Sequence, residues 1–352
     1  MPTTFKNIQT NKNWTPPKDW LIIKTIEMHT GGEPLRVIID GFPEIKGNSV
    51  LECRNYVKSH YDHLRKALMH EPRGHADMYG CLLVPPNDEE GDFGILFLHN
   101  EGYSTMCGHA VIAIATLAVE MNWVAVKSPI TEIKIDAPCG RIHTFVKVMA
   151  GRVEGVYFHC VPSFVVALDE VVAVEGLGEV AYDLAYGGAF YAYVDSDKLG
   201  ISLVSENYSL LIQKGMDIKR AVMQQSKKII HPFEEDLSFL YGTIFIGGPV
   251  SDGLDSRNVC IFAEGEVDRC PTGSGVSGRM PIHYARQEVG INEVMTIESI
   301  TGSVFKGSVV KEVTYGPFQA VIPQVEGTAY ITGTCEFAID PDDPFKYGFF
   351  LR

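Results

Sequence analysis

The fold of this chain is decided by residues 100–110, which read NEGYSTMCGHA. A short apolar run at 95–98 precedes them and is typical of a buried strand. An apolar segment at 111–120 follows and is long enough for a core helix. The pattern therefore predicts a strand-to-helix junction at Cys107 and Gly108.

A helix start at this position would change the chemistry of the cysteine. We expect Ser104 or Thr105 to cap the helix. The first backbone N–H groups of a helix lack partners and carry partial positive charge, which favours a thiolate and lowers the pKa of a thiol. The same groups can hold a substrate carboxylate. A buried structural cysteine beside a helix cap is the alternative interpretation, because cysteine is among the most buried residue types.

Length and composition indicate an ordinary soluble globular protein. The 352 residues suffice for one large or two ordinary domains. A net charge of -14 without a basic cluster argues against nucleic acid and anionic membranes as partners. The N-terminus lacks the apolar core of a secretory signal, and the most apolar stretch, 110–126, is interrupted and too short for a bilayer. We expect a cytoplasmic protein.

Cysteine and histidine spacing predicts neither disulfides nor a metal site. None of the eight cysteines forms a C-x-x-C pair, a pattern typical of reduced thiols in the cytosol. His70 and His75 flank Glu71, but Pro72 and Gly74 would break the helix that a zinc-binding pair needs.

A second motif, DRCPTGSG at 268–275, mirrors the first. A strand-like run at 258–263 precedes it, and a helix-like segment at 276–289 follows. Two similar lobes that each point a helix start into one cleft would form a carboxylate site without an arginine.

The glycines of this second motif also match the G-x-G-x-x-G pattern of dinucleotide sites, at residues 273–278. The preceding strand ends too early for that motif, and no β-α-β unit is evident around it. We therefore predict no nucleotide cofactor.

Three further patterns bear on the fold. Helices are expected at 55–70 and 210–227, and residues 1–20 are expected to form a flexible arm. Gly187 and Gly188 interrupt an apolar run, which indicates a close backbone approach at that point.

Together the motifs identify a resemblance to the proline racemase family. The likeness covers nearly all of residues 21–352 and includes the segments MHTGGEP at 28–34, EPRGH at 71–75 and DDP at 342–344. It implies the α/β (α+β) fold of diaminopimelate epimerase, with two pseudo-twofold-related lobes and the active site between two helix starts. We expect lobes at 21–150 and 151–325, with residues 325–352 packing back on the first lobe, and a possible homodimer.

One departure from the racemase pattern points to a different reaction. Racemases of the family carry a second catalytic cysteine where this chain has Thr272, and a threonine hydroxyl is too weak an acid to serve as that second group. One cysteine and one threonine resemble the trans-3-hydroxy-L-proline dehydratases of the family. That implies a cofactor-free hydro-lyase reaction giving Δ1-pyrroline-2-carboxylate, with the Cys107 thiolate as the base at the α-carbon.

The resemblance also implies the roles of the remaining site residues. The carboxylate would lie against N–H groups around Gly108, His109, Gly273 and Ser274. Asp268 and His109 would contact the ring nitrogen, and Tyr79 and Phe262 would pack against the ring. Ordinary core packing for these two aromatics, and a simple capping role for His109, are the alternatives.

Other functions remain open at this point. A proline racemase or 4-hydroxyproline 2-epimerase would use Cys107 with Cys270 or Thr272, although we expect the Cys270 side chain to point elsewhere. A cysteine peptidase or acyltransferase would pair Cys107 with a histidine. A non-catalytic binding protein would keep the fold without a reactive thiol.

Overall fold

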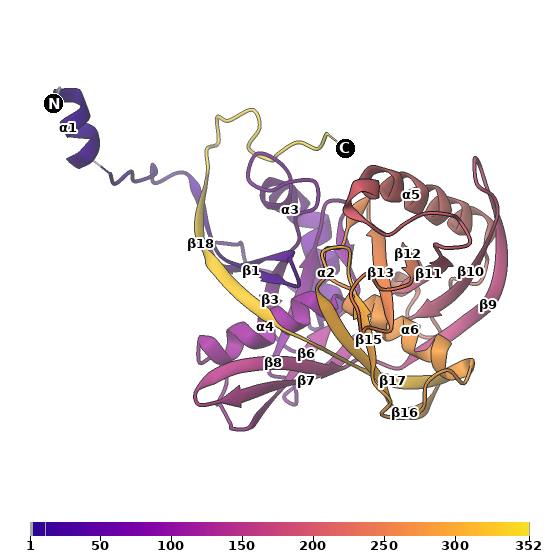
Figure 1. Ribbon diagram of the computed structural model, residues 1–352. Coiled ribbons are helices and arrows are strands. Elements are labelled where there is room, and N and C mark those ends of the chain that lie inside the picture. The colour runs from indigo at the N-terminus through magenta and orange to yellow at the C-terminus, as the bar shows by residue number, and fades with distance from the viewer. Residues whose placement is uncertain (1–2, 11, 352) are drawn as a thin grey trace.

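The computed structural model describes residues 3–10 and 12–351. Within these residues the strands pair into one continuous 18-stranded sheet. Figure 1 shows the sheet divided into two halves, each folded around one central helix. These helices are α4 (Gly108–Glu120) in the first half and α6 (Gly273–Ala285) in the second.

The other elements have the following bounds. The helices are α1 (Thr3–Thr10), α2 (Val50–His60), α3 (Asp62–Met69) and α5 (Tyr208–Gln225), with 3-10 turns η1 (Ser205–Asn207) and η2 (Glu235–Leu237). The strands are β1 (Leu21–Thr30), β2 (Glu33–Asp40), β3 (Gly80–Val84), β4 (Phe93–Leu98), β5 (Tyr103–Ser104), β6 (Ile130–Ala137), β7 (Gly140–Met149), β8 (Arg152–His159), β9 (Ser163–Val174), β10 (Gly178–Tyr186), β11 (Phe190–Asp195), β12 (Leu240–Gly247), β13 (Ser256–Phe262), β14 (Glu266–Val267), β15 (Met295–Glu298), β16 (Val304–Tyr315), β17 (Phe318–Gly327) and β18 (Ala329–Ile339).

The two halves repeat one strand topology. In the first half β2 pairs parallel with β3, β3 antiparallel with β4, and β4 parallel with β6. In the second half β11, β12, β13 and β15 repeat these pairings in the same order. The short strands β5 and β14 precede α4 and α6 respectively. This repeat is the expected two-lobed α/β arrangement.

The halves are joined by strands that cross between them. β8 and β17 pair antiparallel with each other. The chain then continues from β8 into β9, which pairs with β10, and from β17 into β18, which pairs along its full length with β1. The expected division at residue 150 stays a prediction.

Helix α4 forms because its sequence is apolar on every side, which is typical of a helix buried all round. Every residue from Gly108 to Val119 is buried, and the helix contacts β1, β7, β8 and β18. Helix α6 is buried from Gly273 to Ile282 and contacts β9, β16 and β17. Each central helix therefore has only its first turn available to the space between the halves.

The two helix starts meet at a pair of glycines. A Cβ added to Gly108 would lie 2.5 Å from the Gly273 Cα, and one added to Gly273 would lie 2.6 Å from the Gly108 Cα. Real Cβ atoms do not approach other atoms this closely, so both positions need the absence of a side chain. This contact fixes the distance between the two motifs.

Several predicted elements differ from the observed ones. The helix expected at 55–70 is two helices, α2 and α3, because Tyr61 leaves the helical conformation at φ -127°. The cap prediction was wrong, since Cys107 itself is the N-cap of α4. Thr105 instead donates to the Gly188 carbonyl at 2.6 Å, and Ser104 donates to the Met106 carbonyl at 2.8 Å.

The N-terminal segment is not irregular throughout. Helix α1 forms within the expected arm, and Figure 1 shows it standing away from the body of the molecule on an extended connection. Residues 1, 2 and 11 of the expected arm lie outside the described residues. Over the described ranges, no helix is both long enough and apolar enough to cross a bilayer.

The close approach predicted at Gly187 and Gly188 is confirmed. A Cβ on Gly187 would lie 2.2 Å from the Gly278 nitrogen and 2.4 Å from the Ser274 carbonyl oxygen, both in α6. A Cβ on Gly188 would lie 2.5 Å from the Met106 side chain. The β10–β11 turn therefore packs directly on α6.

We predict that Gly187→Ala lowers the free energy of unfolding by about 3 kcal/mol, because the added methyl group forces α6 away from the turn. Urea titration followed by circular dichroism measures the change. Gly248→Ala is the matched control, since a Cβ at Gly248 meets nothing within 4 Å. Equal unfolding midpoints for the two variants would contradict the packing argument.

Candidate active site

The two helix starts open onto one small, tightly enclosed cavity between the halves of the sheet. Every site residue predicted from the sequence lines it. Three further residues, missed by sequence reasoning, also line it: Met106, Tyr191 and Tyr241. The complete lining is Tyr79, Met106, Cys107, Gly108, His109, Tyr191, Tyr241, Phe262, Asp268, Thr272, Gly273 and Ser274.

Cys107 and His109 form a close pair at the start of α4. The Cys107 Sγ lies 3.1 Å from the His109 Nδ1. Burial lowers the pKa of His109 to about 3. A hydrogen bond to the Pro34 backbone raises this pKa, but by less than burial lowers it. His109 is therefore a neutral imidazole near pH 7. Its Nδ1 can accept a hydrogen bond from the thiol and so orient it.

The sequence predicted a lowered pKa for the Cys107 thiol, and the direction of that prediction was wrong. Burial raises the pKa of Cys107 well above its ordinary value, and hydrogen bonds with the Ala110 backbone and the Tyr79 side chain lower it by less. The buried Asp268 and Glu33 raise it further. The effect of burial on the Cys107 pKa is thus larger than the stabilisation of the thiolate expected from the helix N-terminus.

Thr272 occupies the equivalent N-cap position at the start of α6. Its backbone lies in the left-handed region, at φ 66° and ψ 94°, which is unfavourable for a β-branched residue. Its Oγ1 is buried and has no hydrogen-bond partner among the described residues. A strained residue that presents an unsatisfied hydroxyl to a cavity is typical of a position held for a ligand.

Two buried carboxyl groups lie at the cavity: Asp268 lines it, and Glu33 lies outside the lining. Asp268 accepts a hydrogen bond from the Cys270 N–H at 2.8 Å, and burial raises its pKa to about 6. Glu33 accepts one from the Arg269 N–H at 2.8 Å, and burial together with Asp268 raises the pKa of Glu33. Since its pKa lies within about one unit of neutral pH, Asp268 can gain or lose a proton when a ligand arrives.

Cys270 does not line the cavity. Its sulfur accepts the Thr272 N–H at 3.3 Å, and burial raises the pKa of its thiol. The described residues that could hold a metal ion are His109, Asp268 and Cys270, whose ligand atoms lie within 4.8 Å of one another. Asp268 and Cys270 already accept the backbone hydrogen bonds given above, and a metal-free site stays the prediction.

Aromatic residues close the cavity opposite the helix starts. The Tyr79 ring lies edge-on to His109 at 4.8 Å, and the Tyr241 ring lies 5.2 Å from Phe262. The Tyr79 and Tyr241 hydroxyls are 3.4 Å apart and connect the first half to the second. Tyr191 and Ser274 share a hydrogen bond of 2.7 Å. These walls suit a small ring with polar substituents.

The family model described as proline racemase matches residues 25–350. The chain belongs to the proline racemase family. Its relatives within that family include a protein of Colwellia psychrerythraea named trans-3-hydroxy-L-proline dehydratase, 51% identical over 344 residues and covering 97% of each chain. A human protein of the same name is 45% identical over 350 residues, covering 96% of this chain and 97% of its own.

Solved structures of the proline racemase family share the fold. A hydroxyproline epimerase from Agrobacterium vitis with bound trans-4-hydroxy-L-proline superposes with a TM-score of 0.88 at 30% identity, covering 94% of this chain and 96% of its own. A Bacillus anthracis phenazine biosynthesis protein of the PhzF family, with a TM-score of 0.54 at 11% identity, shares the fold alone. The fold class and the family expected from the sequence are both confirmed.

We predict that alkylation of Cys107 by iodoacetamide is slow at pH 7 and rises about tenfold per pH unit up to at least pH 9, because the thiolate is the reacting form. Peptide mass spectrometry of protein quenched at each pH gives the rate. Cys335, which is partly exposed, serves as the internal reference for reagent access. A rate that reaches a plateau below pH 8 would show that the helix N-terminus outweighs burial.

Proposed function

We propose that this protein is a trans-3-hydroxy-L-proline dehydratase that needs no cofactor. The observation that carries the proposal is the pairing of one thiol, Cys107, with one alcohol, Thr272, at the two helix starts that line a single cavity. A racemase needs a proton-transferring group on each face of the α-carbon, whereas elimination of water needs one. The names of the relatives at 45–51% identity support the same reaction.

Binding of the substrate uses the backbone at both helix starts. The first N–H groups of α4 and α6 have no intrahelical acceptors, and those around Gly108, His109, Gly273 and Ser274 surround the carboxylate. Asp268, with its pKa near 6, takes the ring ammonium together with His109. Tyr79 and Phe262 pack against the pyrrolidine ring.

Substrate binding also supplies the charge that the thiol needs. In the empty cavity burial keeps Cys107 protonated. A ring ammonium brought beside Cys107 favours the thiolate, because an opposite charge in a buried site lowers a thiol pKa. The proton released passes to the carboxylate of Asp268, whose pKa of about 6 makes it a stronger base than the imidazole of His109.

Elimination then proceeds on one face of the ring. The Cys107 thiolate takes the α-proton, and the electrons of that C–H bond form the C2–C3 double bond as the C3–O bond breaks. In the trans isomer the α-hydrogen and the 3-hydroxyl share a face, so the newly formed thiol can protonate the departing oxygen as water leaves. The enamine product tautomerises to Δ1-pyrroline-2-carboxylate. Backbone N–H groups stabilise the charge that develops on the carboxylate.

The alternatives are less well supported. A second proton-transferring group at Cys270 would have to reach the ring from outside the cavity lining, with its sulfur already engaged by the Thr272 N–H. The Cys107–His109 contact resembles a peptidase pair, but the backbone of Pro34 takes the place of an orienting Asn or Asp side chain.

We also propose that the protein works in the cytoplasm as a homodimer. All eight cysteines are free thiols, as expected in a reducing compartment. Sedimentation equilibrium at micromolar concentration measures the oligomeric state.

We predict that Cys107→Ser lowers the rate of trans-3-hydroxy-L-proline dehydration roughly 10³-fold while substrate binding remains, because only the acid/base group is lost. Product is measured as pyrroline-2-carboxylate by its colour with o-aminobenzaldehyde, and binding by calorimetry. Cys81→Ser, in a buried strand outside the cavity, is the control. Full turnover in Cys107→Ser would refute the assignment.

We predict that Thr272→Cys gains exchange of the α-proton, because a second thiol then faces the ring from α6. Incubation of L-proline in D2O followed by NMR measures deuterium at the α-carbon and the appearance of D-proline. The unmodified protein should show no racemisation. Racemisation by the unmodified protein would instead favour the racemase or epimerase alternative, with Cys270 as the second group.

A further inference from the structure

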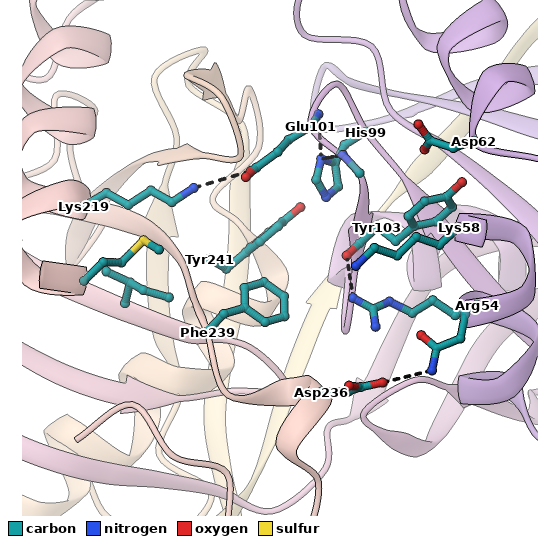
Figure 2. A pocket seen from close by; sticks show the side chains of 14 residues that line it. Arg54, Lys58, Asp62, His99, Glu101, Tyr103, Lys219, Asp236, Phe239 and Tyr241 are labelled. Atoms are coloured by element: carbon teal, nitrogen blue, oxygen red, sulfur yellow. Dashed lines mark hydrogen bonds and ion pairs between the residues drawn. The ribbon is translucent and has the colours of Figure 1, made fainter. Parts of the chain in front are cut away.

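The space between the two halves contains a second, larger cavity of about 520 Å³ (Figure 2). Helices α2 and α3 and the loop before β5 form one wall, and α5 with the segment leading into β12 forms the other. Tyr241 lines both this cavity and the catalytic one. The two spaces therefore adjoin at the Tyr241 ring.

The acidic groups of the larger cavity already have partners. Asp62 pairs with Arg65 at 2.7 Å and Glu101 with Lys219 at 3.6 Å. Asp236 accepts a hydrogen bond of 2.9 Å from Asn55, across the space between the halves. Asp62 and Glu101 are thus balanced by basic side chains, whereas Asp236 is bound by a neutral amide and attracts Arg54 electrostatically.

Two basic groups on α2 are not balanced in this way. Arg54 is only 6% exposed and donates to the Tyr103 carbonyl at 3.1 Å, yet its buried Nε has no hydrogen-bond partner. Neither Arg54 nor Lys58 forms an ion pair with any carboxylate of residues 3–10 and 12–351, and the two side chains lie one turn apart on the same helix face. A buried cation outside a direct ion pair is costly, and Asp236 attracts Arg54 without forming one, so this wall can still take a carboxylate in direct contact.

The other side chains that line the cavity indicate what kind of ligand would fit beside Arg54 and Lys58. His99 accepts the N–H groups of Glu101 and Gly102 at its Nδ1, at 3.3 and 3.2 Å, so its Nε2 carries the ring proton and can donate. Phe239 and Tyr241 present aromatic rings on the other side of the cavity (Figure 2). Such walls fit a small organic anion with an apolar body.

We propose that this cavity is a staging site, where Arg54 and Lys58 bind the carboxylate of an amino-acid-sized ligand before it passes Tyr241 into the catalytic cavity. The ligand ring packs against Phe239 and Tyr241. Identification of the ligand as trans-3-hydroxy-L-proline rests on the proposed function. On a chain with a net charge of -14, two neighbouring cations outside any direct ion pair reduce the repulsion that an incoming carboxylate meets.

Calorimetric titration of Cys107→Ser protein with trans-3-hydroxy-L-proline tests the site without turnover. We expect two binding events per chain. Adding Lys58→Met or Arg54→Met should weaken one event about fivefold to tenfold and leave the other in place, as expected for loss of a charge-assisted hydrogen bond. Lys24→Met is the control, because Lys24 is an exposed lysine on β1 that lines neither cavity. A single event, or two events that both survive Lys58→Met and Arg54→Met, would overturn the proposal.

Turnover provides an independent readout. With Cys107 intact, Lys58→Met should lower kcat/KM about fivefold, more than it lowers kcat, and should weaken the dependence of kcat/KM on salt. Equal kcat/KM values and salt dependences for Lys58→Met and Lys24→Met would count against the staging site.

Failure of the proposed function gives a different result from failure of the staging site. If the unmodified protein does not dehydrate trans-3-hydroxy-L-proline, the same titrations are run with L-proline. A second event that Lys58→Met weakens would support the site even then. Its absence with both ligands would refute the site and leave the assignment of Cys107 untouched.

Discussion

The contact between Gly108 and Gly273 is the constraint on which the rest of the structure depends. It brings the positive ends of two buried helices together, which is unfavourable in the absence of a negative charge. The strands of each half hold these ends in place. Because α4 is buried and packed against strands, it cannot move away from α6. The two helix ends therefore form a site that favours a bound anion at the point where the two halves meet.

Burial determines the charge state of the groups around that point. The same dry surroundings raise the pKa of Cys107, lower that of His109 to about 3 and raise that of Asp268 to about 6. Each shift disfavours a charge that water would otherwise stabilise. The cavity thus holds a protonated thiol, a neutral imidazole and one carboxyl group, Asp268, that ionises near pH 6. A zwitterionic amino acid would bring an ammonium for that carboxylate and a carboxylate for the helix ends.

Much of this arrangement could be predicted from the sequence, because local patterns determine it. The apolar segment after Cys107 and the glycine- and serine-rich segment after Thr272 each predict a helix start, and the second motif shows where the chain repeats itself. The expected close approach at Gly187 had a similar local signal. The division of the segment at 55–70 had none, since Tyr61 is neither glycine nor proline.

Other features depend on tertiary contacts and could not be predicted. Tyr191 and Tyr241 reach the cavity from β11 and β12, which pair with each other far from either motif in the sequence. The direction of the Cys107 pKa shift depends on how completely the two halves enclose the thiol, which no local pattern records. Thr272 could be identified as a substitution, but its left-handed backbone became apparent only in the structure.

The pairing of β18 with β1 has a consequence for the way the chain is made. The first strand of the sheet, at Leu21–Thr30, aligns with residues as late as Ile339. During synthesis the first half therefore emerges from the ribosome with one edge unpaired, and that edge is completed only when nearly the whole polypeptide has been translated. Contacts of such long sequence separation slow folding and leave a strand edge exposed to other chains in the meantime.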